Sequence, residues 1–145
     1  MTAEARAARA VEIARGWIGT PYLHQGSRQG VGCDCLGLLR AIWRALYGCE
    51  PNAVPVYTPD WGEAGRDEAF ERGLRAQMAA WDGVARSGDV LLFRMRAGAV
   101  AKHLGIAGEV GQSPTFIHAY AGHGVLESPL SLPWRRRIVA RFQFR

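Results

Sequence analysis

The spacing of apolar residues changes near Ser87-Gly88-Asp89, and this change constrains the fold more than any other feature of the chain. Before it, apolar residues recur every three or four positions over residues 3–18 and 34–47, which predicts two amphipathic helices. A short third helix, interrupted by a glycine, is expected over 66–80. After the change, alternating or continuous apolar runs predict four strands, over 90–94, 103–107, 115–120 and 138–144. Helices followed by an antiparallel sheet are typical of the α+β class.

Length and composition predict one globular domain that spans residues 1–145. Apolar residues make up 48% of the chain and charged residues 21%, which excludes a disordered or fibrous protein. No apolar run approaches the ~18 to 20 residues that a membrane span requires. The segment from Met1 to Arg9 alternates alanine with charged residues, so we expect no signal peptide and synthesis in the cytoplasm.

Positive charge is concentrated in the second half of the chain. Residues 1–85 hold nine arginines against ten acidic residues, for a net charge of −1, whereas residues 86–145 hold nine basic residues against three acidic ones, for +6. A basic half of this kind indicates an anionic partner, such as nucleic acid, a membrane surface or an anionic cell-wall polymer. A solvated face in an arginine-rich protein explains the same excess, and the sequence leaves both interpretations open.

Cys35 is the candidate nucleophile, because it is expected in the first turn of the helix over 34–47. Backbone N–H groups in that turn are unpaired and carry the positive end of the helix dipole, so they lower the pKa of a thiol and offer donors to a developing oxyanion. Asp34 stands where an N-cap carboxylate would accept backbone hydrogen bonds. A lone cysteine in a helix is also commonly a small buried apolar residue, and that interpretation stays open.

A nucleophilic thiol requires a base, and two of the four histidines lie on predicted strands. His103 opens one strand, on the face that alternation also gives to two small residues, and His118 lies on the next strand. Two adjacent strands can therefore present two imidazoles to one thiol, the second imidazole orienting the first. The loop residue His24 is expected to be solvent-exposed, and His123, between two glycines, is expected in a turn.

Two other kinds of site match the sequence less well. Cys33 and Cys35, together with Cys49 and a histidine, supply enough ligands for zinc, but a single C-x-C pair without a second close pair is a poor match to zinc sites. We therefore expect no metal and no cofactor. Arg135-Arg136-Arg137 is able to contact phosphate, but no P-loop, dinucleotide or nucleic-acid motif accompanies it, so we expect no specific nucleic-acid binding.

Five short motifs, taken in order, resemble those of the NlpC-type cell-wall cysteine peptidases. They extend over about residues 10 to 145 and are Thr20-Pro21-Tyr22, Gly32-Cys33-Asp34-Cys35-Leu36-Gly37-Leu38, Ser87-Gly88-Asp89-Val90-Leu91-Leu92-Phe93, His103-Leu104-Gly105-Ile106 and Ile117-His118-Ala119. The resemblance implies a papain-like α+β fold in which N-terminal helices pack on a C-terminal antiparallel sheet. The segment from Val54 to Trp61, and the leucine after the nucleophile, look like the subgroup encoded beside tail genes of phages and gene transfer agents.

The resemblance also implies a role for each matching residue. The nucleophile falls on the second cysteine of the C-x-C pair, Cys35, the base on His103, and the polar residue that orients the base on His118. Tyr22 falls where the family has a tyrosine that assists the oxyanion hole, and Asp34 matches a structural acid.

Two departures from the family pattern concern the expected substrate subsites more than the chemistry. The family usually has serine after the nucleophile, where this chain has Leu36. It commonly has two glycines after the tyrosine segment, where this chain has His24-Gln25-Gly26.

The activity implied by the resemblance is hydrolysis of peptidoglycan stem peptides, at the γ-D-glutamyl–diaminopimelate bond. The subgroup further implies that the protein is carried in a phage-like tail, binds tail proteins, and acts in the periplasm or cell wall. Two alternatives stay open. One is an amidase or acyltransferase that uses the same Cys–His–His set, and the other is a structural tail subunit that keeps the fold without turnover.

Overall fold

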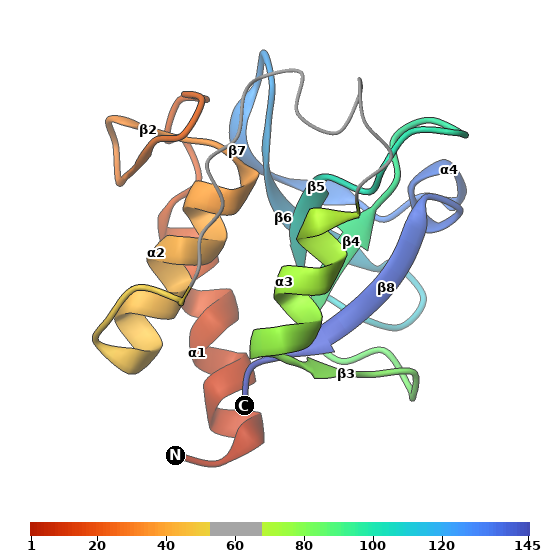
Figure 1. The fold of residues 1–145 in the computed structure, drawn as a ribbon, viewed down its shortest axis with the longest axis horizontal. Helices are drawn as coiled ribbons and strands as arrows, with labels where there is room; N and C mark the ends of the chain where they lie inside the picture. The colour runs from red at the N-terminus through yellow and green to blue at the C-terminus, as the bar shows by residue number, and fades with distance from the viewer. Residues whose placement is uncertain (53–67) are drawn as a thin grey trace.

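The structure is a computed structural model, and it describes residues 1–52 and 68–145. The Val54 to Trp61 motif and the start of the third predicted helix lie outside the described residues. The elements in chain order are α1 (Ala3–Gly16), β1 (Ser27–Arg28), β2 (Gly32–Cys33), α2 (Cys35–Tyr47), α3 (Ala69–Gln77), β3 (Ala79–Ala80), β4 (Val90–Phe93), β5 (His103–Ala107), β6 (Thr115–Tyr120), β7 (Gly124–Pro129), α4 (Leu132–Arg135) and β8 (Ile138–Gln143). Figure 1 shows α1, α2 and α3 gathered beside a twisted sheet, which confirms the predicted α+β class.

Both long helices begin at side chains that cap them, and of these Asp34 was predicted from the sequence. Asp34 precedes α2, and its carboxylate accepts a hydrogen bond from the Gly37 N–H at 2.7 Å. Thr2 caps α1 in the same way, through a 3.0 Å bond from the Ala5 N–H. Each cap satisfies one of the backbone donors that a helix start leaves unpaired. α2 ends at Gly48, whose φ of 75° is the left-handed conformation that glycine adopts without a steric penalty.

The larger sheet is antiparallel and has the strand order β3-β8-β4-β5-β6-β7. β5 and β6 have the bounds that the alternation predicts, and β4 and β8 end one residue earlier than expected. β7 was not predicted, because its later residues, Glu127-Ser128-Pro129, carry no apolar alternation. β7 nevertheless pairs with β6 over six residue pairs, so the sheet extends beyond the predicted strands on that side.

The two faces of the sheet are covered by different parts of the chain. Leu38 and Ile42 of α2 belong to the same buried cluster as Leu104 and Ile106 of β5, so the helices cover one face. On the other face, Phe93 and other buried residues of β4, β5 and β6 form a second cluster that packs against α4. Alternation along β5 therefore directs His103 toward the α4 side of the sheet and its neighbour Leu104 toward the helices. Within residues 1–52 and 68–145, no helix combines the length and apolar character needed to cross a bilayer.

Gly37 permits a close contact that fixes the loop before α2 against the helix. A Cβ atom at this position would lie 1.7 Å from the carbonyl oxygen of Gly26. Backbone atoms at both ends of this contact leave no flexible side chain to move aside. Gly73 in α3 is the opposite case, since a Cβ there would meet no atom within 4 Å.

We therefore expect Gly37→Ala and Gly73→Ala to change stability in opposite directions. Gly37→Ala should lower the free energy of unfolding by about 1–3 kcal/mol or more, because the loop has to move away from α2. Gly73→Ala should raise it by about 0.5–1 kcal/mol, because alanine loses less backbone entropy in a helix. Urea denaturation followed by circular dichroism measures both values. A Gly37→Ala protein as stable as the parent would contradict the close contact.

Candidate active site

The thiol of Cys35 lies against the backbone of β5. Cys35 is the first residue of α2, and its Sγ donates a hydrogen bond to the Lys102 carbonyl oxygen at 3.4 Å. The N–H of Leu104 also faces the sulfur and favours its anionic form, as do the N–H groups of Cys35 and Leu36. The thiol is therefore held by the backbone on both sides of His103, at the beginning of β5.

Two imidazoles form a hydrogen-bonded pair across β5 and β6. His103 Nε2 lies 2.8 Å from His118 Nδ1, and both side chains are buried, with exposed fractions of 8% and 1%. His118 Nε2 lies 2.9 Å from the hydroxyl oxygen of Ser128 on β7. A continuous series of polar groups thus connects three adjacent strands. His103 and His118, the two strand histidines proposed for the site, are thus in direct contact.

Ser128 influences which ring nitrogens of His103 and His118 carry a proton. For His103 Nδ1 to accept a proton, its Nε2 must carry hydrogen and donate to His118 Nδ1. His118 then carries hydrogen on Nε2 and donates to the Ser128 hydroxyl oxygen, at the distance observed. Sequence reasoning missed Ser128. The glycines on either side of His123 are a hairpin signal, and pairing outward from them places β7 beside His118.

An aromatic cluster covers the imidazole pair on the face of the sheet opposite α2. The indole of Trp134, in α4, is central to it, with ring centroids 5.8 Å from His103 and 5.3 Å from His118. The ring of Phe116 lies 4.1 Å from that of His118. Neither Trp134 nor its helix was predicted as part of the site. The cluster excludes water from the pair and restricts rotation of both rings.

Burial makes the neutral forms of the thiol and the imidazoles the stable ones. The pKa of Cys35 is raised to about 12, first by desolvation and then by the negative charge of Asp34. The pKa of His103 is lowered to about 3 by desolvation and by His118, and that of His118 to about 4 by desolvation and by His123. In this arrangement the resting site therefore holds a thiol and two neutral imidazoles at neutral pH.

The other two residues proposed for the site lie next to the thiol's helix. The buried Asp34 carboxylate accepts hydrogen bonds from the N–H groups of Gly37 and Gln25, both at 2.7 Å, so its role in the fold is structural. Tyr22 bridges to Cys33 and is 38% exposed. Burial raises the pKa of Tyr22 to about 12, and negative charge on Cys35 adds to the shift.

His24 and His123, set aside as catalytic candidates, lie at the edge of the site. His24 Nδ1 is 3.8 Å from an oxygen of Asp34, and the side chain is about one-third exposed. His123 lies in the turn between β6 and β7, as predicted, and stacks on Tyr120 with ring centroids 5.3 Å apart.

The three cysteines occupy different environments. Cys33 is buried in β2, Cys35 is partly buried at the start of α2, and Cys49 is exposed beyond its end. A helix of this length separates Cys35 from Cys49 by about 20 Å, so the three thiols do not meet at one metal. Among the described residues, no group of three or more histidine, cysteine or acidic side chains is placed to hold a metal ion.

The basic segment after Trp134 has a structural role in part. The Arg137 guanidinium donates hydrogen bonds to the carbonyl oxygens of Met95 and Pro133, both at 3.2 Å, and lies over the Trp134 ring. Arg137 therefore ties α4 to the loop after β4. Like Arg135 and Arg136, Arg137 is exposed to solvent.

Comparison with known proteins shows the fold. No protein-family model and no curated protein matches the chain. It is similar in structure to the NlpC/p60 domain of the peptidoglycan hydrolase SagA, with 22% identity, a TM-score of 0.65 and coverage of 94% of this chain and 97% of that one. It is also similar to a Staphylococcus aureus protein described as similar to lipoprotein, of the NLP/P60 family, with 19% identity and a TM-score of 0.63.

The second comparison covers 96% of this chain but only 41% of the Staphylococcus aureus chain, which is much longer. The two similarities confirm the predicted papain-like, NlpC-type fold, with helices packed on an antiparallel sheet. At these levels of identity they bear on the fold and not on the activity.

The lowered imidazole pKa values predict that stability decreases in mild acid. In the unfolded chain a histidine takes up a proton near pH 6.5, whereas in the folded protein His118 resists protonation until about pH 4. The stabilisation is therefore complete above pH 6.5 and is lost as the pH falls toward 4. We expect the free energy of unfolding to drop by on the order of 2 kcal/mol between pH 7 and pH 4.5.

Urea denaturation at several pH values measures this dependence. His118→Asn should remove the part of it that His118 contributes and leave the part from His103, whereas the control variant His123→Asn, in the exposed turn, should keep most of the dependence. An unchanged slope in His118→Asn would show that the imidazole pair is not held neutral by burial.

Proposed function

We propose that the protein is a cysteine peptidase that hydrolyses peptidoglycan stem peptides. The observation that carries this proposal is the position of the Cys35 thiol at a helix N-terminus, held against the backbone on both sides of His103. His103 is in turn bonded to a second buried imidazole. The fold shared with the NlpC/p60 domain of a peptidoglycan hydrolase supports the choice of substrate.

In the proposed first step the thiol transfers its proton to His103 as it attacks the scissile carbonyl. His103 Nε2 is bonded to His118, so Nδ1 is the ring atom that receives the proton. The thiol must leave the Lys102 carbonyl oxygen for this transfer. Because burial opposes a free thiolate, the proton moves together with the attack, and the imidazolium and the developing oxyanion stabilise each other.

The backbone N–H groups at the start of α2 are the donors available to the oxyanion, with the Tyr22 hydroxyl as an additional candidate. Collapse of the tetrahedral intermediate expels the amine, which takes the proton from His103 and leaves an acyl group on Cys35. A water molecule then attacks the thioester while His103 acts as base again. Release of the carboxylate product restores the thiol.

His118 and Ser128 are positioning residues in this mechanism. They act through His103, by favouring the tautomer whose Nδ1 is free to accept the thiol's proton. His118 also stabilises the positive charge that His103 acquires during the reaction. Neither residue needs to exchange a proton with the substrate.

Three finer proposals rest on the sequence resemblance. The bond cleaved is the γ-D-glutamyl–diaminopimelate bond of the stem peptide. The protein is carried in the tail of a phage or gene transfer agent, where it binds other tail proteins. It acts in the periplasm or cell wall after delivery by that particle.

Release of peptidoglycan fragments from purified cell walls, identified by mass spectrometry, tests the activity and the bond. Cys35→Ala should abolish release, and His103→Ala should come close to the same loss, because members of one catalytic unit are not additive. His118→Ala should lose about 10²- to 10³-fold. Cys33→Ser and Cys49→Ser should retain most activity, with circular dichroism as the control for folding.

Substitutions of Ser128 test its positioning role in the same assay. Ser128→Ala should lower kcat by about 10-fold with little change in KM, and Ser128→Thr, which restores a hydroxyl, should recover most of the loss. An active Cys35→Ala protein would contradict the mechanism. A folded parent protein without any activity on cell walls would favour the structural-subunit alternative.

The tail proposal predicts that the protein is a component of assembled particles. Mass spectrometry of tails purified from the producing strain should detect it at a fixed ratio to the other tail proteins. Deletion of its gene should leave particles that assemble but enter cells less efficiently. Particles without the protein, isolated from cells that express it, would contradict the proposal.

A further inference from the structure

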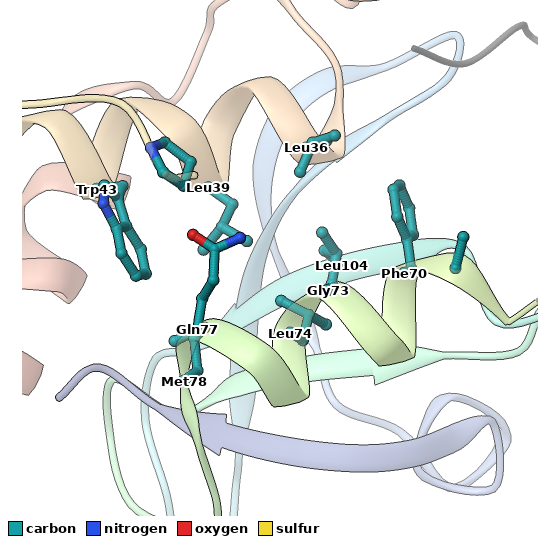
Figure 2. Close-up of a pocket in the computed structure, with 11 residues that line it drawn as sticks. Leu36, Leu39, Trp43, Phe70, Gly73, Leu74, Gln77, Met78 and Leu104 are labelled. Carbon is teal, nitrogen blue, oxygen red and sulfur yellow. The ribbon is translucent and has the colours of Figure 1, made fainter. Parts of the chain in front are cut away.

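An apolar pocket lies between α2 and α3 (Figure 2), and its lining includes Leu36, the residue that follows the nucleophile. Its walls are mostly aliphatic and aromatic side chains, including Leu39, Phe70, Leu74 and Met78. Its volume is about 50 Å³, enough for a short aliphatic group. The mechanism above does not use this pocket.

Two residues connect the pocket to the reacting thiol. Leu36 follows Cys35 in α2, and Leu104 is the β5 residue whose N–H faces the sulfur. Both residues line the pocket, so one end of it is formed by residues whose backbone N–H groups face the thiol. NlpC-type motifs usually carry serine at the position of Leu36. The leucine therefore makes this wall of the pocket apolar, where a serine would add a hydroxyl group.

One polar atom in the pocket has no hydrogen-bond partner. Within the part of the chain that the structure describes, Oε1 of Gln77 is buried and unpaired, while Nε2 of the same amide donates to the Asn52 carbonyl oxygen at 2.5 Å. A carbonyl oxygen only accepts, so this bond fixes which way the amide points. Figure 2 shows the amide reaching from α3 toward Leu39 and Trp43 of α2. The pocket therefore contains one fixed acceptor in apolar surroundings.

We propose that this pocket binds an aliphatic substituent of the substrate, adjacent to the bond that Cys35 attacks. Gln77 Oε1 accepts a hydrogen bond from a hydroxyl or N–H group on that substituent. An unpaired buried acceptor is costly, so a donor that reaches it adds both affinity and selectivity. The proposal rests on the proposed function, because it takes Cys35 as the nucleophile, and it adds the chemical class of one substrate group.

Alkylation of Cys35 by chloroacetamides tests the pocket without requiring the natural substrate. The sulfur displaces chloride, so a C–S bond forms as the C–Cl bond breaks, and the thiol proton leaves to His103 or to buffer. N-methyl and N-butyl chloroacetamide differ by three methylene groups. Each buried methylene is worth a factor of about 4, so the N-butyl reagent should react faster by at least about 10-fold and up to about 60-fold. Because Cys49 is also an exposed thiol, rates are followed at the peptide that contains Cys35, by mass spectrometry after digestion, and divided by the rates with free cysteine.

Two leucine substitutions in α3 distinguish binding of the reagent in the pocket from an effect of any added leucine on the reactivity of Cys35. Gly73 lines the pocket, and a Cβ there meets no atom within 4 Å, so Gly73→Leu should fill the space without a backbone clash. It should reduce the butyl-to-methyl ratio to about 3 or less. Ala76→Leu adds the same side chain to the same helix at an exposed position and should leave the ratio unchanged.

The acceptor is tested with a third reagent, N-(4-hydroxybutyl) chloroacetamide. With the parent protein it should react at least as fast as the N-butyl reagent, because Gln77 Oε1 accepts its hydroxyl. With Gln77→Leu the order should reverse, and the N-butyl reagent should react about 10-fold faster, because the hydroxyl then has no partner. A Gln77→Leu protein that keeps the parent's order would overturn the role of the acceptor.

The outcomes distinguish the pocket from the proposed function. If Cys35 reacts with all three reagents at equal normalised rates while cell-wall hydrolysis is intact, the pocket proposal fails and the function stands. The pocket proposal fails in the same way if Gly73→Leu and Ala76→Leu give equal butyl-to-methyl ratios. If Cys35 reacts with none of the reagents and the walls are not digested, both proposals fail.

Discussion

The buried carboxylate of Asp34 is the interaction on which the geometry of the site depends. One oxygen accepts the N–H of Gly37 in the first turn of α2, and the other accepts the N–H of Gln25 in the preceding loop. These charge-assisted bonds compensate the cost of burying the charge and fix the point at which α2 begins. The same charge raises the pKa of the Cys35 thiol. Asp34 therefore positions the nucleophile without activating it, and activation depends on the imidazole pair.

The surroundings of the imidazole pair likewise hold the two rings in place while making them weaker bases. The aromatic cluster around Trp134 holds His103 and His118 in contact, and its low polarity lowers the pKa of both rings. A base with a low pKa is a weak acceptor until a charge develops nearby. The geometry thus favours proton transfer that is coupled to attack on a bound carbonyl over a permanent thiolate–imidazolium pair. Ser128 accepts a hydrogen bond from His118 and so favours the tautomer in which His103 Nδ1 is free to accept a proton.

β5 contributes side chains to both faces of the sheet, because successive side chains of a strand point in opposite directions. His103 points to the aromatic face and belongs to the imidazole pair, whereas Leu104 points to the helices and lines the apolar pocket. The backbone on both sides of His103, at the Lys102 carbonyl and the Leu104 N–H, meets the Cys35 thiol. Three consecutive residues, Lys102 to Leu104, therefore place the base, the contacts of the nucleophile and one wall of the proposed substrate pocket.

Features that depend on neighbouring residues were predictable from the sequence by itself. The helix over 34–47, its caps at Asp34 and Gly48, and the two histidine strands follow from local hydrogen bonds and apolar spacing, and the structure confirms them. The places of Ser128 and Gln77 were not predictable. Ser128 reaches His118 only through the pairing of β6 with β7, whose sequence lacks alternation, and the Gln77 pocket forms only where α2, α3 and β5 pack together. Strand register and helix packing are decided by contacts between distant segments, which no local pattern specifies.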